Sequence, residues 1–542
     1  MRTAFHPHCL ARHGLARHGQ SSSQPGSIFN GQVAASDPHA KRLPPTNDFR
    51  FQGGRLPDAG NGCYGDRNSE IISQGDSRSV RFVVTLADPP QVFLEQRSPS
   101  MYRAILPLGS LLLLVVSSLV VGNLHAQENN RPPSGYQALF NGKDLSGWHG
   151  MGHFDPRKLA AMSDEERQEK RKTDLLDVAK HWTVEDGDLV NDGQGVYLTT
   201  NDDFENIDLW IDYATVPKAD SGIYLRASPQ VQIWDYTKEG GKWNIGADKG
   251  SGGLWNNSSG TAGKDPTVLA DKPLGEWNRF RIQQLGSRTS VWLNDQKVVD
   301  NAVMENFWDR NRPLRRSGPI QLQTHGGEIR WKNLFVREIP WEEALEEFRS
   351  RNADGFVSVF NGKDFTGWSG PTDNYAIVDE TLVCKPGSGG TIFTDEVYGD
   401  FVVRFEFKLP PGGNNGLAIR YPGSGDTAYV GMCELQVIDS EHPKYADLDD
   451  RQYHGSAYGM APAARGYLRP TGEWNFQEVT VKGSTIKVEL NGYVILNTDL
   501  GQVEEFMAGS AHPGKDRTEG HFGFAGHSDP VQFRNVSIKR LD

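Results

Sequence analysis

Apolar and polar residues alternate along many short segments of the chain. The segments 209–216 (LWIDYATV), 279–285 (RFRIQQL) and 401–409 (FVVRFEFKL) place an apolar side chain at nearly every second position. This is the spacing of a strand with one face in a core. Gly, Asn, Asp and Pro separate the segments. Short alternating strands with turn residues between them predict an all-β protein of antiparallel two-sheet sandwiches.

Two segments depart from this alternation and predict helices. Residues 155–182 are highly charged and contain SDEE at 163–166, which is typical of a helix N-terminus. Residues 340–355 begin PWEEALEEF and end near Gly355. The first segment is interpreted as an insertion, either a lid or a surface decoration, and the second as a helical linker.

The same decapeptide occurs twice, 220 positions apart. Residues 139–148 read LFNGKDLSGW and residues 359–368 read VFNGKDFTGW. Further pairs follow in the same order: HWTVEDGDLV with NYAIVDETLV, SGIYLR with NGLAIR, QVQIWD with ELQVID, GEWN with GEWN, and WLNDQKVV with ELNGYVIL. Such a repeat indicates two tandem copies of one domain. We place the domains at 135–339 and 355–542, with the linker at 340–354.

The decapeptide itself is interpreted as structural. Its Asn-Gly pair is typical of a tight turn, and Trp148 and Trp368 are expected to anchor a core. It then recurs because the fold recurs.

The only long apolar run lies at 105–122, after Met101 and Arg103. A short charged start, an apolar stretch and small residues before Gln127 predict a secretory signal peptide at 101–126. Export to the periplasm or medium would follow, with no stable membrane insertion after cleavage. The alternative is an uncleaved anchor at 105–122. Residues 1–100 match neither repeat and are interpreted as a doubtful or disordered extension.

Composition and charge limit which kinds of binding partner are expected. The chain has 542 residues and a formal net charge of -12, without a basic stripe, so a nucleic acid is not expected as a partner. Cys384 and Cys433 both lie in the second repeat, where export would allow a disulfide; two buried thiols are the alternative. Cys9 and Cys63 lie in the extension. No cysteine spacing is typical of a zinc site.

The repeated motifs resemble those of the domain of unknown function 1080 family, also called 3-keto-disaccharide hydrolase or 3-keto-glucoside 1,2-lyase/hydratase. The motifs are FNGKDLSGW, SGIYLR, the QxxD strand, GEWN and the closing HGGEIRWKNL and VQFRNVSI segments. The resemblance implies two tandem concanavalin A-like jelly-roll sandwiches. It also implies action on 3-keto-glycosides, with a small glycoside or oligosaccharide as substrate.

This reaction requires a particular set of groups. A ketone at C3 of a sugar acidifies the C2–H bond, so a base can remove that proton while the C1 substituent leaves; water then adds back. The site needs a base, an acid for the leaving oxygen and a donor for the enolate oxygen. We expect no cofactor and no metal. An ordinary glycosidase would use two carboxylates instead.

The strongest catalytic candidates lie in ELQVID, 434–439. Side chains alternate along a strand, so Glu434 and Gln436 share one face, which Asp439 joins only across a bulge. In the first repeat Gln230 stands in place of Glu434. This favours catalysis in the second repeat and binding in the first. Glu434 could instead be a structural carboxylate paired with Arg420.

Two histidines complete the predicted catalytic set. His454 has no histidine counterpart in the first repeat, and His527 matches His325 just before the last strand. A neutral histidine suits proton transfer near neutral pH, although a lone loop histidine is more often structural. The predicted substrate-binding residues are Gln436, Arg420, Tyr458, Arg226, Gln232, Trp234, Asp235, Trp255 and His325.

Alternatives remain open at several of these positions. Arg226 and Arg420 could be buried and paired with Asp235 or Asp439. The acidic loop 445–452 is consistent with calcium binding or with plain solvation. The whole chain could also be a non-catalytic, lectin-like carbohydrate-binding protein. The sugar, its linkage and its anomer do not follow from the sequence.

Overall fold

The computed structural model describes residues 129–542. The predicted extension and the predicted signal peptide therefore lie outside the described residues, as do Cys9 and Cys63. Within 129–542, no helix is long and apolar enough to cross a membrane.

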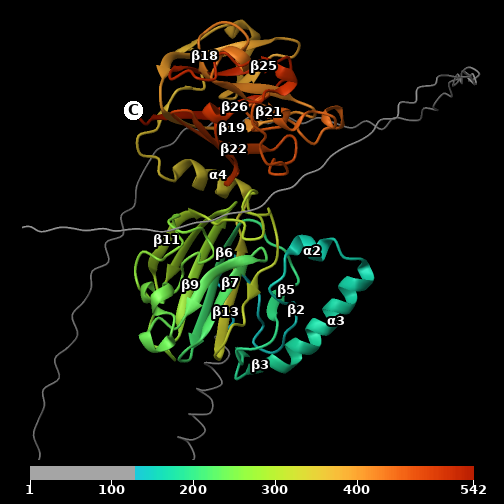
Figure 1. The fold of residues 1–542 in the computed structure, drawn as a ribbon, viewed down its shortest axis with the longest axis vertical. Coiled ribbons are helices and arrows are strands. Elements are labelled where there is room, and N and C mark those ends of the chain that lie inside the picture. The colour runs from blue at the N-terminus through green and yellow to red at the C-terminus, as the bar shows by residue number, and fades with distance from the viewer. Residues whose placement is uncertain (1–128) are drawn as a thin grey trace, which may run out of the picture. The chain divides into compact units, whose positions relative to one another are not determined.

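The first repeat folds as two packed antiparallel sheets (Figure 1). One has eight strands in the order β11-β10-β9-β6-β13-β4-β3, with β1 paired to β13, and the other has five in the order β2-β5-β12-β7-β8. We call this pair of sheets the first sandwich. The strands are β1 (Gln137–Ala138), β2 (Trp148–Met151), β3 (Trp182–Glu185), β4 (Asp188–Asn191), β5 (Tyr197–Thr200), β6 (Ile207–Thr215), β7 (Asp220–Leu225), β8 (Ser228–Trp234), β9 (Asn278–Leu285), β10 (Arg288–Leu293), β11 (Gln296–Val303), β12 (Gln321–Leu322) and β13 (Ile329–Glu338).

The second repeat forms the same pair of sheets, here called the second sandwich. Its eight-stranded sheet has the order β16-β17-β26-β19-β22-β23-β24, with β14 paired to β26, and its five-stranded sheet has the order β15-β18-β25-β20-β21. The strands are β14 (Val357–Ser358), β15 (Trp368–Ser369), β16 (Tyr375–Val378), β17 (Thr381–Cys384), β18 (Gly389–Tyr398), β19 (Phe401–Lys408), β20 (Asn414–Tyr421), β21 (Cys433–Ile438), β22 (Trp474–Lys482), β23 (Thr485–Leu490), β24 (Tyr493–Asp499), β25 (Gly520–His527) and β26 (Gln532–Arg540). The predicted all-β fold of two tandem sandwiches is confirmed.

Each sandwich has its own core, built from the inward positions of alternating strands. The repeated decapeptide serves that core, as predicted. The Trp148 indole donates to the Leu139 carbonyl at 2.7 Å, and Trp368 does the same to Val359 at 2.8 Å. In the turn before each Trp, the Asn141 or Asn361 side-chain oxygen accepts backbone N–H groups two and three residues on. The motif is thus a turn and an anchor.

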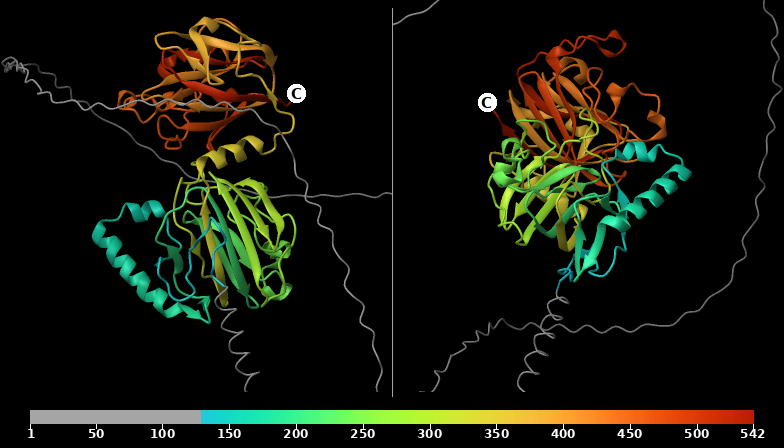
Figure 2. Two further views of the ribbon diagram at one scale, coloured as in Figure 1. Left: turned by 180° about the vertical axis from the view of Figure 1, so that it is seen from behind. Right: turned by 60° about the horizontal axis from the view of Figure 1, so that its bottom comes forward.

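The charged insertion forms two helices, α2 (Pro156–Ala160) and α3 (Asp164–His181). The Ser163 hydroxyl accepts from the Glu166 N–H and the Glu166 carboxylate accepts from the Ser163 N–H, which is the predicted capping box. Helix α3 contacts β2 at the edge of the five-stranded sheet. Both views in Figure 2 show the insertion along the side of the first sandwich.

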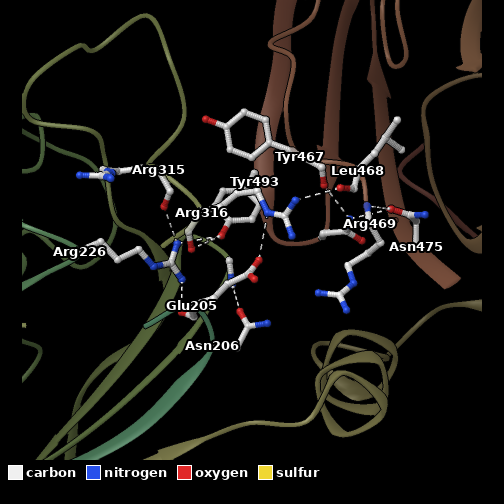
Figure 3. A network of polar contacts seen from close by, with 12 residues as sticks. Glu205, Asn206, Arg226, Arg315, Arg316, Tyr467, Leu468, Arg469, Asn475 and Tyr493 are labelled. Atoms are coloured by element: carbon white, nitrogen blue, oxygen red, sulfur yellow. Dashed lines mark hydrogen bonds and ion pairs between the residues drawn. The ribbon is translucent and has the colours of Figure 1, made fainter. Parts of the chain in front are cut away.

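The linker forms helix α4 (Trp341–Ser350), and its apolar face packs between the sandwiches. Phe348 stacks on Phe476 of the second sandwich with ring centroids 5.3 Å apart. Polar contacts also join the sandwiches (Figure 3). The Arg226 guanidinium donates to the Tyr493 hydroxyl at 2.8 Å. Elsewhere in the interface, buried Glu489 accepts from Arg288 and Arg351. A buried carboxylate needs such partners to offset its lost hydration.

Candidate active site

A cleft of about 300 Å³ opens on the five-stranded sheet of the second sandwich. Strands β20, β21 and β25 form its floor, and the loops after β20 and β21 form its walls. The lining residues are Asn414, Asp426, Ala428, Tyr429, Glu434, Gln436, Ile438, Tyr445, Leu448, Gln452, Tyr458 and His527. Four of the predicted site residues therefore meet in one cleft: Glu434, Gln436, Tyr458 and His527.

A carboxylate–histidine pair lies in this cleft. The His527 Nε2 atom is 3.2 Å from the Glu434 Oε1 atom. The Glu434 side chain is 5% exposed and the His527 side chain 45% exposed, so the pair reaches from the floor to solvent. The hydrogen bond to Glu434 raises the pKa of His527, against the opposing effect of burial. Protonated His527 is therefore stabilised beside a carboxylate.

Two amide oxygens beside this pair have no partner within the described chain. They are Gln436 Oε1 and Asn414 Oδ1, both fully covered atoms. Asn414 and Gln436 belong to neighbouring strands, since Asn414 pairs with Ile438 and Gly416 with Gln436. A buried acceptor without a donor is costly, which favours a ligand that brings O–H groups to it.

Two tyrosines form an aromatic wall. Tyr429 and Tyr458 pack edge to face with ring centroids 6.3 Å apart. The Gln452 amide donates to the Tyr458 hydroxyl at 3.4 Å, and burial raises the pKa of Tyr458. Tyr458 is therefore a neutral hydroxyl that can donate a hydrogen bond across the cleft.

Small residues lie beside Glu434 on the strands that form the cleft floor. Gly416, Ala418 and Gly523 occupy adjacent strands, with Ala418 in register with Gly523. A Cβ atom at position 416 would overlap the Glu434 side chain. Gly416 is therefore required for the carboxylate to lie flat against β20.

The structure does not place His454 in the cleft. Its imidazole is buried in the core, stacked on Phe407 with centroids 5.1 Å apart, and its Nε2 lies 3.0 Å from Gln477 Oε1. Burial lowers the pKa of His454 to about 3. The prediction of a catalytic role does not suit this position, because no ligand in the cleft can reach a core side chain.

Asp439 and Asp235 hold loops instead of facing a ligand. Asp439 Oδ2 accepts from the Gly412 N–H at 2.8 Å, and Asp235 accepts from the N–H groups of Lys218 and Thr237. Asp439 follows the last residue of β21, without the bulge that would bring it to the face of Glu434. Its predicted catalytic role and the predicted sugar contact of Asp235 are therefore corrected to turn stabilisation.

Arg420 and Arg226 also bond to groups of the protein outside the cleft. Arg420 pairs with Asp400 at 2.9 Å and donates to the carbonyls of Gly399, Gly483 and Arg517. Arg226 donates to the Arg315 carbonyl and to Tyr493 between the sandwiches (Figure 3). Neither pairs with Asp235, Asp439 or Glu434. Their predicted contacts with sugar are not supported, since every one of these partners lies away from the cleft.

In the first sandwich, the predicted binding residues form a different set of contacts. Gln230 donates to Gln232, and Gln232 donates to Asp220 Oδ1 at 2.8 Å. His325 Nδ1 lies 2.7 Å from Asp220 Oδ2, where Lys242 also binds. Asp220 and Lys242 were not among the predicted site residues.

The predicted tryptophans of the first sandwich differ in exposure. Trp234 is 4% exposed, and its indole donates to the Gly250 carbonyl at 2.8 Å, so its ring cannot serve as an open stacking surface. Trp255 is partly exposed and packs edge to face on Trp234. Its neighbour Leu254 bridges to Val231 as Ala457 bridges to Leu435, so Trp255 and Tyr458 are equivalent positions.

Several cleft residues were missed by the sequence analysis, namely Asn414, Asp426, Tyr429, Tyr445 and Gln452. Of these residues, Asn414 could have been predicted from the sequence. It precedes the NGLAIR motif, and counting back by two from Gly416 puts it on the face of Gln436. The other four lie in the connections after β20 and β21, where Tyr429 belongs to the short helix α5 (Thr427–Val430). No periodicity encodes how such connections approach the sheet.

The cysteines and the acidic loop 445–452 have the following contacts in the described chain. Cys384 and Cys433 are buried free thiols, so the disulfide alternative is wrong. In the loop 445–452, Asp449 caps the turn at Asp450–Gln452 and pairs with Arg451 at 2.8 Å. Between residues 129 and 542, no group of three or more His, Cys, Asp and Glu side chains is arranged to hold a metal.

Comparison with known families covers both sandwiches. Residues 135–337 and 355–539 each match the 3-keto-alpha-glucoside-1,2-lyase-like domain. The chain belongs to this family, in two tandem copies. A relative named 3-keto-disaccharide hydrolase, from Bacteroides thetaiotaomicron, is 27% identical over 232 residues, which are 35% of this chain and 80% of the relative.

Solved structures also resemble parts of this chain. A crystal structure from Parabacteroides distasonis, provisionally assigned as a glycosyl hydrolase, is 28% identical with a TM-score of 0.32; the match covers 35% of this chain and 95% of that one. A carbohydrate-binding module from Bacillus subtilis is 14% identical with a TM-score of 0.22, covering 32% of this chain and 97% of the module.

Proposed function

We propose that this chain is a carbohydrate-active enzyme that cleaves 3-keto-glycosides by elimination and hydration, with its principal site in the second sandwich. Family membership and the named relative support the substrate class. The observation that carries the proposal is the buried Glu434 carboxylate bonded to the half-exposed His527 in a cleft with unpartnered acceptors. This arrangement supplies a base, an acid and places for sugar hydroxyls.

The first half of the reaction is elimination. Glu434 takes the proton from C2, the C2–H electron pair becomes the C1=C2 double bond, and the C1–O bond breaks. The leaving oxygen takes a proton from His527, whose raised pKa keeps that proton available near neutral pH. The Tyr458 hydroxyl is the candidate donor to the enolate oxygen at C3.

Hydration returns both groups to their starting states. Neutral His527 takes a proton from water as the water oxygen attacks C1. Protonated Glu434 then returns its proton to C2. One water is consumed, and the net result is hydrolysis of the glycosidic bond. Gln436 and Asn414 would accept hydrogen bonds from the ring hydroxyls throughout.

The test is release from a chromogenic 3-keto-glucoside beside the unoxidised glucoside, using the full chain. Glu434→Gln keeps the size of the side chain and removes its proton exchange, so kcat/KM for the keto compound should fall about 100-fold. The control Glu441→Gln changes a 66% exposed carboxylate outside the cleft and should leave the rate unchanged.

Other outcomes would point elsewhere. Undiminished release by Glu434→Gln would move the site away from this cleft. Equal release from the unoxidised glucoside would indicate an ordinary glycosidase. Binding of the keto compound without any release would favour the lectin-like alternative. The wild-type rate should also decline at alkaline pH through a pKa above 6.5, because the reaction needs protonated His527.

We also propose export through the apolar segment 105–122, because the order of charged, apolar and small residues from 101 to 126 is that of a signal peptide. Expression of the whole chain in a bacterium, with and without residues 101–126, tests this. The full chain should reach the periplasm with Gln127 as its new N-terminus. Retention of residues 105–122 in a membrane fraction would favour the anchor instead.

A further inference from the structure

The carboxylate that the first sandwich lacks at Gln230 is present on the neighbouring strand. Asp220 starts β7 in register with Trp234, just as Asn414 starts β20 in register with Ile438. Glu434 and Asn414 in one sandwich are therefore Gln230 and Asp220 in the other. The carboxylate and the amide have exchanged strands, and each sandwich keeps one carboxylate bonded to the equivalent histidine, His527 or His325.

The exchange also changes which ring nitrogen of the histidine bonds the carboxylate. Glu434 bonds the Nε2 of His527, whereas Asp220 bonds the Nδ1 of His325 and leaves the Nε2 of His325 to meet a ligand. Asp220 is 8% exposed and is also held by Gln232 and Lys242, while the His325 side chain is 58% exposed. A fixed carboxylate with an accessible imidazole is how proteins orient a histidine for proton transfer.

The insertion builds an aromatic wall beside this pair. His153, directly before α2, lies 3.0 Å from the Tyr224 hydroxyl through its Nδ1, and its ring packs against Trp308 with centroids 4.7 Å apart. Arg157 of α2 donates to the Trp308 carbonyl at 2.6 Å and to Asp309 at 2.8 Å. The second sandwich lacks this insertion and has Ala418 in place of Tyr224.

We propose that the open face of the first sandwich is a second glycosyl-binding site, in which Asp220 orients His325 for proton exchange and the packed rings of Trp308 and His153 form a wall on one side of the sugar ring. The sugar class rests on the proposed function. Aromatic faces beside hydrogen-bonding side chains suit a sugar ring, which presents C–H groups on one side and hydroxyls at its edge. This is a different site from the cleft of the second sandwich, with its own wall.

The charges around the two histidines are opposite in effect. Asp220, Lys242 and His153 face His325; burial comes first, and the Lys242 ammonium second, in lowering the pKa of His325. His325 is thus neutral where His527 is still protonated. With a 3-keto-glycoside bound, His325 Nε2 would take the C2 proton, the electron pair would form C1=C2, the C1–O bond would break, and a water would give a proton to the leaving oxygen. The hydroxide formed from that water would add to C1, and His325 would return its proton to C2, so that one water is consumed and the glycosidic bond is hydrolysed.

The kinetic experiment uses the full chain with Glu434→Gln, so that the second sandwich is silenced. The residual release from the 3-keto-glucoside should rise with pH through a pKa below 6.5. Adding His325→Gln should lower it at least tenfold further. The matched control adds His181→Gln, a histidine bonded to Asp192 at 2.9 Å, and should not change the residual rate.

Asp220 is tested as a positioning residue. Asp220→Asn should lower the residual rate and move its pH limb, whereas Asp220→Glu should restore part of both, which a purely structural role would not require. Residual release equal to the uncatalysed rate would overturn proton exchange by His325 at the second site, and so would residual release that His325→Gln leaves unchanged. The binding count below decides whether the site binds sugar.

A binding count separates this proposal from the proposed function. The Glu434→Gln, His325→Gln chain, titrated calorimetrically with the 3-keto-glucoside, should bind two molecules, and Trp308→Ala should leave one. If the wild-type chain released nothing, the proposed function would fail, yet a count of two falling to one would still uphold the second binding site. A count of one in both chains would overturn it.

Discussion

The two sandwiches have the same strands in the same order, yet the open faces of their five-stranded sheets carry different chemistry. At positions in register, the second sandwich has Gly416, Ala418 and Gly523 where the first has Gly222, Tyr224 and Gln321. The first sandwich therefore has a tyrosine and a glutamine where the second has an alanine and a glycine. Inward positions stay apolar in both. Packing therefore constrains one face of a strand while the other face remains free to change.

The largest expected difference between the sandwiches comes from filling the space beside Glu434. Gly416→Ala should place a methyl group where the Glu434 side chain lies and lower kcat/KM more than 100-fold by displacing the carboxylate. Gly222→Ala is the matched change, with the Gln230 side chain at 3.0 Å, and should have little effect on the principal rate. Equal losses in the two variants would mean that a general loss of folding explains both.

A second difference predicts acid sensitivity. His454 of the second sandwich stands where the first has Ser251, and its folded pKa of about 3 lies below the ordinary 6.5. The unfolded chain therefore binds this proton first as pH falls, so stability decreases from about pH 6.5 toward pH 3. The cost at pH 5 is about 2 kcal/mol.

Urea unfolding at pH 7.5 and pH 5 checks this expectation. His454→Gln should lower the free energy of unfolding at pH 7.5 by roughly 1 kcal/mol through altered packing on Phe407, yet lose less on acidification than the wild type. A wild-type chain and a variant with the same loss between the two pH values would contradict the assignment.

A smaller effect sharpens the roles of the equivalent aromatics. Tyr458→Phe removes the hydroxyl proposed to meet the enolate and should lower kcat about 10-fold with little change in KM. Trp255→Phe, in the first sandwich, should leave kcat of the wild-type chain nearly unchanged. A rise in KM alone for Tyr458→Phe would make Tyr458 a binding group.

The smallest effect should be the same in both sandwiches. Asn141→Ala and Asn361→Ala each remove the side-chain oxygen that holds the turn of the decapeptide and should each cost about 1 kcal/mol of unfolding free energy. Thermal unfolding measures this. Loss of activity without loss of stability in Asn361→Ala would contradict a structural role for the motif.

The sequence predicted the fold well because core positions follow simple periods. Alternation located the strands, the SDEE cap located α3, and the repeat predicted a second sandwich. The site was predicted in part. Glu434 and Gln436 followed from period two, and His527 from its place before the last strand. The pairing of His527 with Glu434, 93 positions away, depends on strand order, which local patterns do not encode.

The errors have a common physical cause. His454, Asp439 and Arg420 are polar residues whose partners lie inside the fold, at Gln477, the Gly412 N–H and Asp400. The sequence gives the type of a polar residue but does not show whether its partner is a buried group of the protein or a ligand. Asp220 escaped notice for the opposite reason, because its importance appears only when two strands are placed side by side.

The buried Glu489 limits how this protein can be divided. Its carboxylate belongs to the second sandwich, while one of its two guanidinium partners, Arg288, belongs to the first and the other, Arg351, follows α4. A fragment that contains only α4 and the second sandwich would lack Arg288 and leave Glu489 with one guanidinium partner instead of two. Replacing either half with that of a relative would therefore require matching charges at the positions of Glu489 and Arg288.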